Sequence, residues 1–141
     1  MNKLTDLSDL YALAEKDAVK VDCFRLASCQ SISIQDSGGN CYIGIDPMKL
    51  ESENDEKVKL AHELGHCETG SFYNRSSPFD IREKHEQTAN RWAVKKLVPK
   101  SELVPLLKKG YERWELAEHF EVTEDFINLA IRMYFEYGIA V

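Results

Sequence analysis

Apolar residues recur at the spacing of a helix over residues 6–17. Side chains three and four positions apart share one face of a helix, so this segment predicts an amphipathic helix that covers a sheet. Its apolar positions are Leu7, Leu10, Tyr11, Leu13 and Ala14.

A period of two residues follows, which is typical of strands with one buried face. The apolar positions in this part of the chain are Val19, Val21, Phe24, Ile32 and Ile34. The turn sequence Gly38-Gly39-Asn40 comes next, and the short stretch CYIGID follows it at residues 41–46. A glycine-rich turn between two such stretches predicts a hairpin, so we expect a small antiparallel sheet.

Residues 52–70 predict a second helix. Ser52 and the acidic residues after it are typical of a helix N-terminus, and Gly70 is typical of a helix C-terminus. One face of this helix would carry Leu60, Leu64 and Cys67, and another would carry His62 and His66. The first face can be buried while the second lines a cleft.

The rest of the chain reads as a loop and four further helices. Residues 71–81 show no period and predict a loop, and the next helix begins near Arg82 and ends before Pro99. The apolar stripe of that helix is Ala89, Trp92, Ala93 and Leu97. Three shorter helical segments follow, at about residues 101–109, 113–120 and 123–137.

The composition fits one compact domain. With 141 residues, of which 43% are hydrophobic, the chain is long enough to bury a core and too short for two domains. We therefore predict a single α+β domain over residues 1–141. Its sheet and two-helix core would occupy residues 1–99, and a helical extension would occupy residues 100–141.

Composition also bears on location and partners. Residues 1–18 lack the apolar segment and cleavage site of a secretory signal, and no run approaches the roughly 18 apolar residues of a membrane span. These features predict a cytoplasmic protein with reduced thiols at Cys23, Cys29, Cys41 and Cys67. The net charge of −6 repels a phosphate backbone, so nucleic acid is not an expected direct partner.

Residues 62–66 read HELGH, an HExxH motif. A separation of four residues brings the imidazoles of His62 and His66 to one helical face, where each can donate a nitrogen lone pair to zinc. Glu63, between them, would be the general base of a peptidase. Zinc lowers the pKa of water to about 7 and polarises a peptide carbonyl, and Mn²⁺ or another divalent metal is the alternative.

Three residues compete for the position of third ligand. Glu86 lies twenty residues beyond His66 on the next predicted helix, which can pack antiparallel against the motif helix. Glu68 is too near His66 to swing back easily, and His85 would point about 100° away from Glu86. We therefore favour Glu86, which with two histidines leaves an open coordination position.

Other side chains are candidates to support the chemistry. Asn90 follows Glu86 by four residues and can accept a hydrogen bond from a ligand histidine, for which we expect His62. Tyr73 and His119 are candidates to stabilise the oxyanion that forms on the scissile carbonyl.

Two stretches of sequence resemble the ImmA/IrrE family of metallopeptidases, small enzymes of bacteria, phages and integrative elements. They are LAHELGH at residues 60–66 and EQTANRWAVKKLVP at residues 86–99. The family pattern after HELGH is E-x-x-A-[ND]-x-[aromatic]-A, then leucine and proline. The chain meets it at Glu86, Ala89, Asn90, Trp92, Ala93, Leu97 and Pro99.

This resemblance implies roles for the same residues. His62, His66 and Glu86 would be the metal ligands, and Glu63 would be the catalytic acid and base. The substrate it implies is a helix-turn-helix transcriptional repressor cut at one site. Lys96 stands where the family more often has an apolar residue, which implies a more solvated helix edge.

The C-terminal segment offers a rival hypothesis. The pattern of residues 114–134 predicts a helix, a turn at residues 121–123 and a second helix. This order resembles a DNA-binding helix-turn-helix. The second helix begins with Glu124 and Asp125 and has Arg132 as its only base, which disfavours DNA binding. Its apolar positions predict packing against the core instead, and they are Phe126, Ile127, Ala130, Ile131 and Tyr134.

A third hypothesis is a protein that binds metal without cleaving a substrate. Such a protein would act as a regulator or as an antitoxin-like component. It stays open because a fold and a set of ligands do not guarantee turnover.

Overall fold

The structure of this chain is a computed structural model that describes residues 4–74 and 76–136. Within these residues, helices and one small sheet confirm the predicted α+β class. None of the helices in this part of the chain is long and apolar enough to cross a membrane. The elements in chain order are α1 (Leu7–Lys16), β1 (Lys20–Cys23), β2 (Ser31–Gln35), β3 (Cys41–Ile45), the 3-10 helix η1 (Pro47–Lys49), α2 (Glu53–Thr69), α3 (Phe79–Leu97), α4 (Lys100–Lys108), α5 (Arg113–Phe120) and α6 (Glu124–Phe135).

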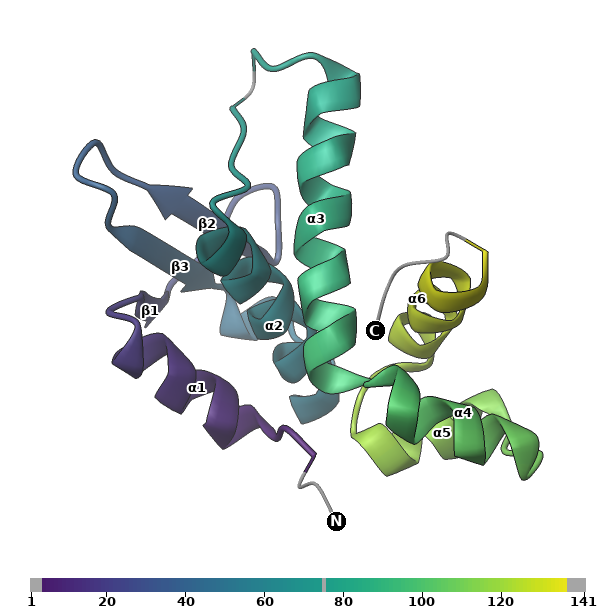
Figure 1. The fold of residues 1–141 in the computed structure, drawn as a ribbon. Helices are drawn as coiled ribbons and strands as arrows, with labels where there is room; N and C mark the ends of the chain where they lie inside the picture. Colours follow the sequence, from purple (N-terminus) through teal and green to yellow (C-terminus); the bar gives the residue numbers. More distant parts are fainter. Residues whose placement is uncertain (1–3, 75, 137–141) are drawn as a thin grey trace.

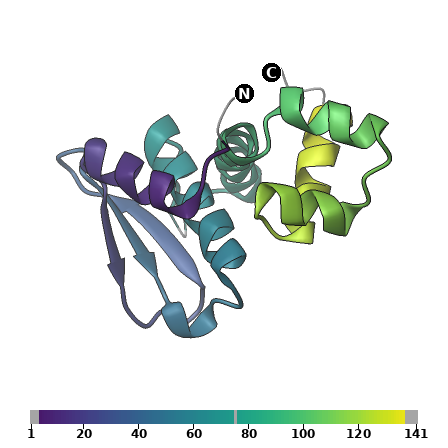
Figure 2. The ribbon, with the colours of Figure 1, turned by 90° about the horizontal axis from the view of Figure 1, so that it is seen from below.

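The long helix α3 stands between two groups of elements (Figure 1). Seen from below in Figure 2, the sheet, α1 and α2 lie on one side of α3, and α4, α5 and α6 lie on the other. One cluster of buried apolar side chains includes residues from both groups. Among its fully buried members are Leu10, Ile43, Leu64, Leu97 and Phe120.

The three strands form a mixed sheet in the order β1-β3-β2. β2 and β3 are the predicted antiparallel hairpin, with Ser31 opposite Ile45 and Gln35 opposite Cys41. β1 pairs with β3 in parallel, so the prediction of an antiparallel sheet was wrong for this strand. The hairpin follows from a local turn, whereas nothing local marks the partner of β1.

Residues at the end of β3 hold the connection between β1 and β2. Asp46, which is 2% exposed, accepts hydrogen bonds from the backbone N–H groups of Leu26 and Met48, both at 3.0 Å. The ammonium of Lys49 donates to the carbonyl oxygens of Leu26 and Cys29. These bonds fix the path of the chain between β1 and β2, which lets β1 lie beside β3 in the parallel direction.

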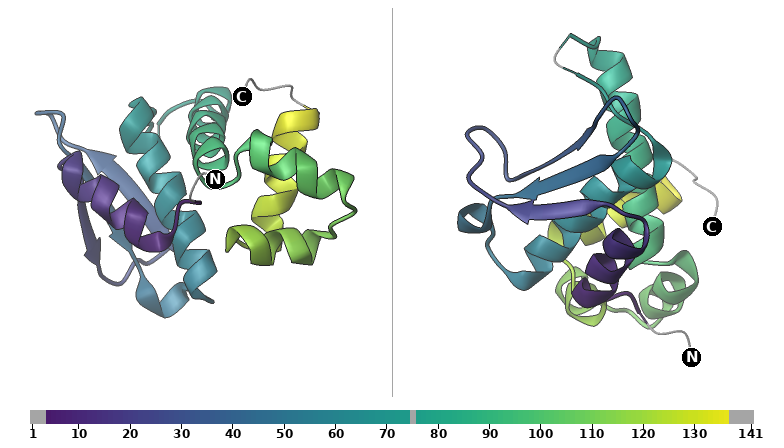
Figure 3. Two further views of the ribbon diagram at one scale, coloured as in Figure 1. Left: turned by 60° about the horizontal axis from the view of Figure 1, so that its bottom comes forward. Right: turned by 90° about the vertical axis from the view of Figure 1, so that its left-hand side faces the viewer.

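β2 turns its polar side chains, not its apolar ones, towards α2. The hydroxyls of Ser31 and Ser33 reach α2, whereas Ile32 and Ile34 are 40% and 55% exposed. The right-hand view of Figure 3 looks onto the sheet, with α2 and α3 behind it. The alternation in β2 therefore predicts a strand correctly, but the face that it turns inward is the partly buried serine face.

Local signals account for both ends of α2 and for the start of α3. Ser52 accepts a backbone hydrogen bond from the first turn of α2, and Gly70 ends that helix with φ +64°, as predicted. α3 begins at Phe79, three residues before the predicted Arg82. It follows directly on Pro78, whose ring presets φ and suits a helix start.

Gly65 sets the distance between α2 and α3. A Cβ atom at this position would lie 2.5 Å from the carbonyl oxygen of Ala89, and a helix backbone cannot easily move aside. The small residues Gly65 and Ala89 therefore let the two helices approach closely. Since the HExxH residues lie on α2 and Glu86 lies on α3, this contact determines whether they meet.

Two hydrogen bonds join the C-terminal helices to α2 and to the end of α3. The ammonium of Lys57 in α2, which is 2% exposed, donates to the carbonyl oxygen of Phe120 at 2.8 Å. The hydroxyl of Tyr134 donates to the carbonyl oxygen of Val98 at 2.9 Å. The predicted apolar stripe of α6 packs in the core, with Phe126, Ile127, Ala130 and Tyr134 buried and Ile131 partly buried.

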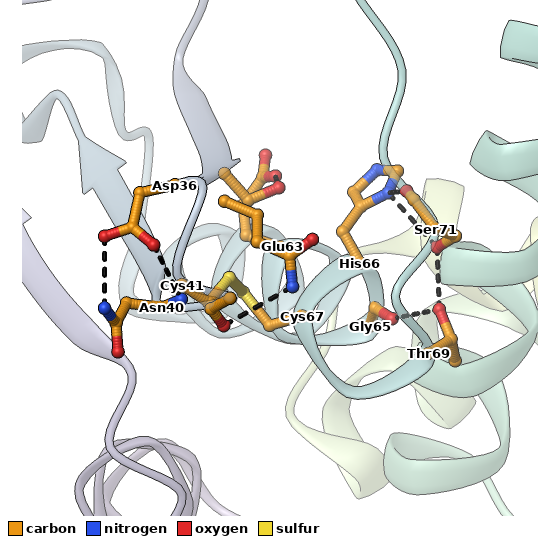
Figure 4. Close-up of a disulfide and its surroundings, with 12 residues drawn as sticks. Asp36, Asn40, Cys41, Glu63, Gly65, His66, Cys67, Thr69 and Ser71 are labelled. Atoms are coloured by element: carbon orange, nitrogen blue, oxygen red, sulfur yellow. Dashed lines mark hydrogen bonds between the residues drawn. A yellow bond between two sulfur atoms is a disulfide. The ribbon is translucent and has the colours of Figure 1, made fainter.

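A disulfide joins β3 to α2 (Figure 4). Cys41 and Cys67 are 26 residues apart in sequence, and their Cα atoms lie 6.0 Å apart. The prediction of four reduced thiols was therefore wrong for this pair, while Cys23 and Cys29 are free. The pairing depends on how α2 packs on the sheet, which no cysteine spacing reveals.

Loss of this disulfide should destabilise the fold. Because a cross-link between residues 26 apart restricts the unfolded chain, Cys41→Ser should lower the free energy of unfolding by about 3 kcal/mol. Chemical denaturation without reductant measures this change. Cys23→Ser is the matched control, since Cys23 is an exposed free thiol. Four reactive thiols in the denatured, unreduced wild type would contradict the disulfide.

Gly65→Ala should force α2 and α3 apart. Alanine favours a helix over glycine by about 1 kcal/mol, but overpacking against a backbone atom costs about 1 to 3 kcal/mol and should dominate. We expect a lower Tm in a thermal melt. Gly38→Ala is the control, because a Cβ there meets side-chain atoms no nearer than 3.4 Å. An unchanged Tm for Gly65→Ala would show that this contact does not set the helix spacing.

Candidate metal centre

Two histidines of α2 place nitrogen atoms side by side. His62 and His66 lie one helical turn apart, and their Nε2 atoms are 3.3 Å from each other. The side chain of His66 is 6% exposed and that of His62 is 24% exposed. The pair is therefore largely withdrawn from solvent, with His62 the more accessible of the two.

Glu86 of α3 completes the group, as the sequence predicts. Its Oε2 atom lies 2.8 Å from Nε2 of His62 and 2.9 Å from Nε2 of His66. These three atoms form a compact triangle between two helices.

The two competing third ligands have other partners. The carboxyl of Glu68 shares a hydrogen bond with Asp17. The ring of His85 stacks on that of Tyr73, with 6.4 Å between ring centroids. Among the three candidates, Glu86 is the one seen to contact both histidines of the motif.

The separations within the triangle suit a divalent metal. Tetrahedral ligand atoms about 2.0 to 2.1 Å from zinc lie about 3.3 Å from one another. The two Nε2 atoms already have this spacing, at 3.3 Å. The two N–O distances, at 2.8 Å and 2.9 Å, are about 0.5 Å shorter than this tetrahedral spacing. Two imidazoles and a carboxylate are also a donor set of catalytic zinc sites, so the residues fit the metal.

An acceptor on the other nitrogen orients each imidazole. Nδ1 of His62 lies 2.7 Å from Oδ1 of Asn90, which is the predicted contact. Nδ1 of His66 lies 2.5 Å from the carbonyl oxygen of Ser71, just beyond the end of α2 (Figure 4). These oxygens only accept hydrogen bonds, so each Nδ1 donates, and each neutral ring keeps the Nε2 lone pair for a metal.

Charges in the triangle stabilise one another. Burial raises the pKa of Glu86, but hydrogen bonds with His62 and His66, whose Nε2 atoms donate when the imidazoles are protonated, outweigh it and hold that pKa far below its usual value. Burial lowers the pKa of His62, but hydrogen bonding to Glu86 and the charges of Glu63 and Glu86 outweigh it, so that pKa is raised. Glu86 is thus ionised, as a carboxylate ligand must be.

Glu63 lies beside the triangle, and hydrogen bonds from the sheet hold its carboxylate. Ligand atoms of Glu63 and the two histidines lie within 4.8 Å of one another. However, its Oε2 accepts a hydrogen bond from Ser31 and its Oε1 accepts one from Ser33, both at 2.7 Å. These bonds distinguish Glu63 from Glu86, which contacts both imidazoles, and favour Glu86 as the third ligand.

A cavity of about 530 Å³ opens beside these residues. Phe72 and Tyr73, from the loop after α2, contribute to its lining. The hydroxyl of Tyr73 donates to Oε1 of Glu86 at 2.6 Å, and burial together with this bond raises the pKa of Tyr73 to about 12. Arg82 also lines the cavity, and its buried Nε has no hydrogen-bond partner within the described residues.

The second predicted oxyanion donor lies elsewhere. The ring of His119 contacts the rings of Tyr111 and Phe120, at centroid distances of 6.4 Å and 4.8 Å. His119 does not line the cavity, so the structure brings Tyr73 to the site and leaves His119 among the C-terminal helices.

The sequence did not predict the part that three serines play in the site. Ser31 and Ser33 share one face of β2 at positions i and i+2, but the isoleucines at positions 32 and 34 suggested that the other face is buried. Ser71 acts through its backbone carbonyl, which no side-chain pattern reveals. The alternation itself was the available signal, since it places both hydroxyls on one face.

Comparison with known protein families finds a match. A family model for peptidase M78, described as the IrrE N-terminal-like domain, matches residues 42–132. The match covers well over half of the chain, including the HExxH motif and Glu86. No curated protein and no solved structure matches significantly. The class of protein defined here is a metallopeptidase. The chain belongs to the peptidase M78 family, which confirms the resemblance to ImmA/IrrE enzymes.

Loss of any member of the triangle should remove the metal. Wild type, loaded with zinc and desalted, should retain near one zinc per chain by mass spectrometry. Glu86→Ala and His62→Ala should each weaken retention by more than about 100-fold, because each removes one of three ligands. Glu68→Ala is the control, since it removes a carboxylate whose hydrogen-bond partner is Asp17. Full zinc content in Glu86→Ala would contradict the ligand assignment.

Proposed function

We propose that this chain is a zinc-dependent metallo-endopeptidase that hydrolyses a peptide bond in a protein substrate. The convergence of the imidazoles of His62 and His66 with the carboxylate of Glu86, beside Glu63 and an open cavity, carries this proposal. Membership of a metallopeptidase family supports it.

Each residue then has a defined task. His62, His66 and Glu86 hold the metal, which when bound supplies Lewis acidity, making water more acidic and a carbonyl more electrophilic. Glu63 takes a proton from the attacking water and delivers it to the leaving amine. Its two serine hydrogen bonds leave carboxylate lone pairs free for this transfer.

Tyr73 is the proposed oxyanion donor. The phenol is protonated at neutral pH, since its pKa is raised further above that range, so it can donate a hydrogen bond. The hydroxyl of Tyr73, which donates to Glu86, belongs to a residue that lines the cavity. Rotation of this side chain would direct the hydroxyl at a tetrahedral oxyanion. Asn90 holds His62 in the tautomer that binds metal.

The substrate we propose is a helix-turn-helix transcriptional repressor. This step rests on the resemblance to ImmA/IrrE enzymes and not on the cavity itself. A repressor acts on DNA in the cytoplasm, so the proposal also places the enzyme there. Zinc is the proposed metal, with Mn²⁺ or another divalent ion as the alternative for the same donors.

Glu63→Gln should separate metal binding from cleavage. The amide cannot accept the proton of water, so cleavage should fall by about 100-fold to 10,000-fold while zinc content stays near one per chain. Mass spectrometry of a panel of purified helix-turn-helix repressors and of a quenched fluorogenic peptide library, each incubated with zinc-loaded protein, measures cleavage.

Glu83→Gln provides the matched control, because Glu83 is an exposed acid on α3. Cleavage by Glu63→Gln at the wild-type rate would remove the general-base assignment. A wild type that retains zinc but cuts neither set of substrates would favour the metal-binding regulator over the peptidase.

A further inference from the structure

The serine face of β2 interrupts an otherwise apolar surface. Ser31 and Ser33 pair with Ile45 and Ile43 of β3, which are each 1% exposed and face α2. An aliphatic side chain in place of either serine would extend the buried surface of the sheet. Instead, β2 presents two hydroxyls there, and both reach the carboxylate of Glu63, which is 6% exposed.

The geometry of the two bonds is specific. Each hydroxyl takes a different oxygen of Glu63, and each O–H···O distance is 2.7 Å, the length of a strong bond to a charged acceptor. One bond fixes the position of a carboxylate, and a second bond on the other oxygen also fixes its plane. Strand pairing with β3 holds both hydroxyls in register.

We infer that Ser31 and Ser33 are positioning residues for Glu63, an inference that rests on the proposed function. A glutamate on a helix has three rotatable side-chain bonds and loses activity as a base if it swings away from the reacting water. The hydroxyls hold Glu63 in one orientation beside the triangle. They leave unused lone pairs on both oxygens for the proton it transfers.

A purely structural role makes a different prediction. If the hydroxyls only satisfy a buried carboxylate, their loss lowers stability and leaves kcat unchanged in the folded protein. If they position the base, their loss lowers kcat while KM and zinc content stay near the wild-type values, because neither substrate contacts nor metal ligands change.

The test compares four zinc-loaded proteins, all studied well below their melting temperatures. They are wild type, the double variant Ser31→Ala with Ser33→Ala, the double variant Ser31→Thr with Ser33→Thr, and Gln35→Ala. Threonine keeps the hydroxyl and suits a strand, so it should rescue activity. Gln35 follows on the same strand face but bonds to the carbonyl of Gly39, so it controls for changes to β2. The probe is the best-cut peptide of the quenched fluorogenic library.

A second readout needs neither metal nor substrate. In the metal-free protein, removal of both hydroxyls should change the unfolding equilibrium constant at least tenfold more when Glu63 is present than in a Glu63→Ala background. This double-mutant cycle measures the contact itself, and an absent coupling overturns the inference.

The outcomes separate the inference from the proposed function. A kcat at least tenfold lower in the alanine pair, with wild-type KM and zinc content and with rescue by threonine, supports the inference. A wild-type kcat in the double alanine variant overturns the inference, while the proposed peptidase function is retained. A wild type that holds zinc and cuts no substrate, with the coupling present, overturns the proposed function and the positioning role together.

Discussion

The close approach of α2 and α3 at Gly65 is the constraint on which the rest of the structure depends. α2 supplies two imidazoles and α3 supplies a carboxylate, and these groups reach bonding distance because no side chain separates the helices there. The sheet and the C-terminal helices then fix α2 from other directions, through the Cys41–Cys67 disulfide and through Lys57. The candidate centre is thus a property of helix packing as much as of the motif.

Two carboxylates share this small space because each has its own set of partners. Glu86 contacts two histidines and a tyrosine, and these contacts stabilise the negative charge of its carboxylate. Glu63 is bound by hydroxyls from the opposite side, from β2. Identical functional groups are therefore held in different surroundings, and the sheet takes part in the site although none of its residues is a candidate ligand.

Features with local causes were predictable, and features that depend on packing were not. The span of α2 follows from Ser52 and Gly70, and the β2–β3 hairpin follows from its glycine turn. The contact between His62 and Asn90 was also predictable, because motif spacing places each residue on a known helix face. The parallel pairing of β1, the disulfide and the contact of the serine face with Glu63 were not, since each joins segments whose proximity only the folded chain establishes.

The buried ammonium of Lys57 has a consequence for where this protein can be shortened. A chain ending at Pro99 would contain every candidate ligand, the proposed general base and both serines of β2. It would also lack the carbonyl of Phe120, which holds the ammonium of Lys57 five residues before the motif. Apolar side chains of α3 that pack against α6 would become exposed to solvent as well. The smallest stable fragment is therefore set by the support of α2, which extends far past the last residue of the candidate site.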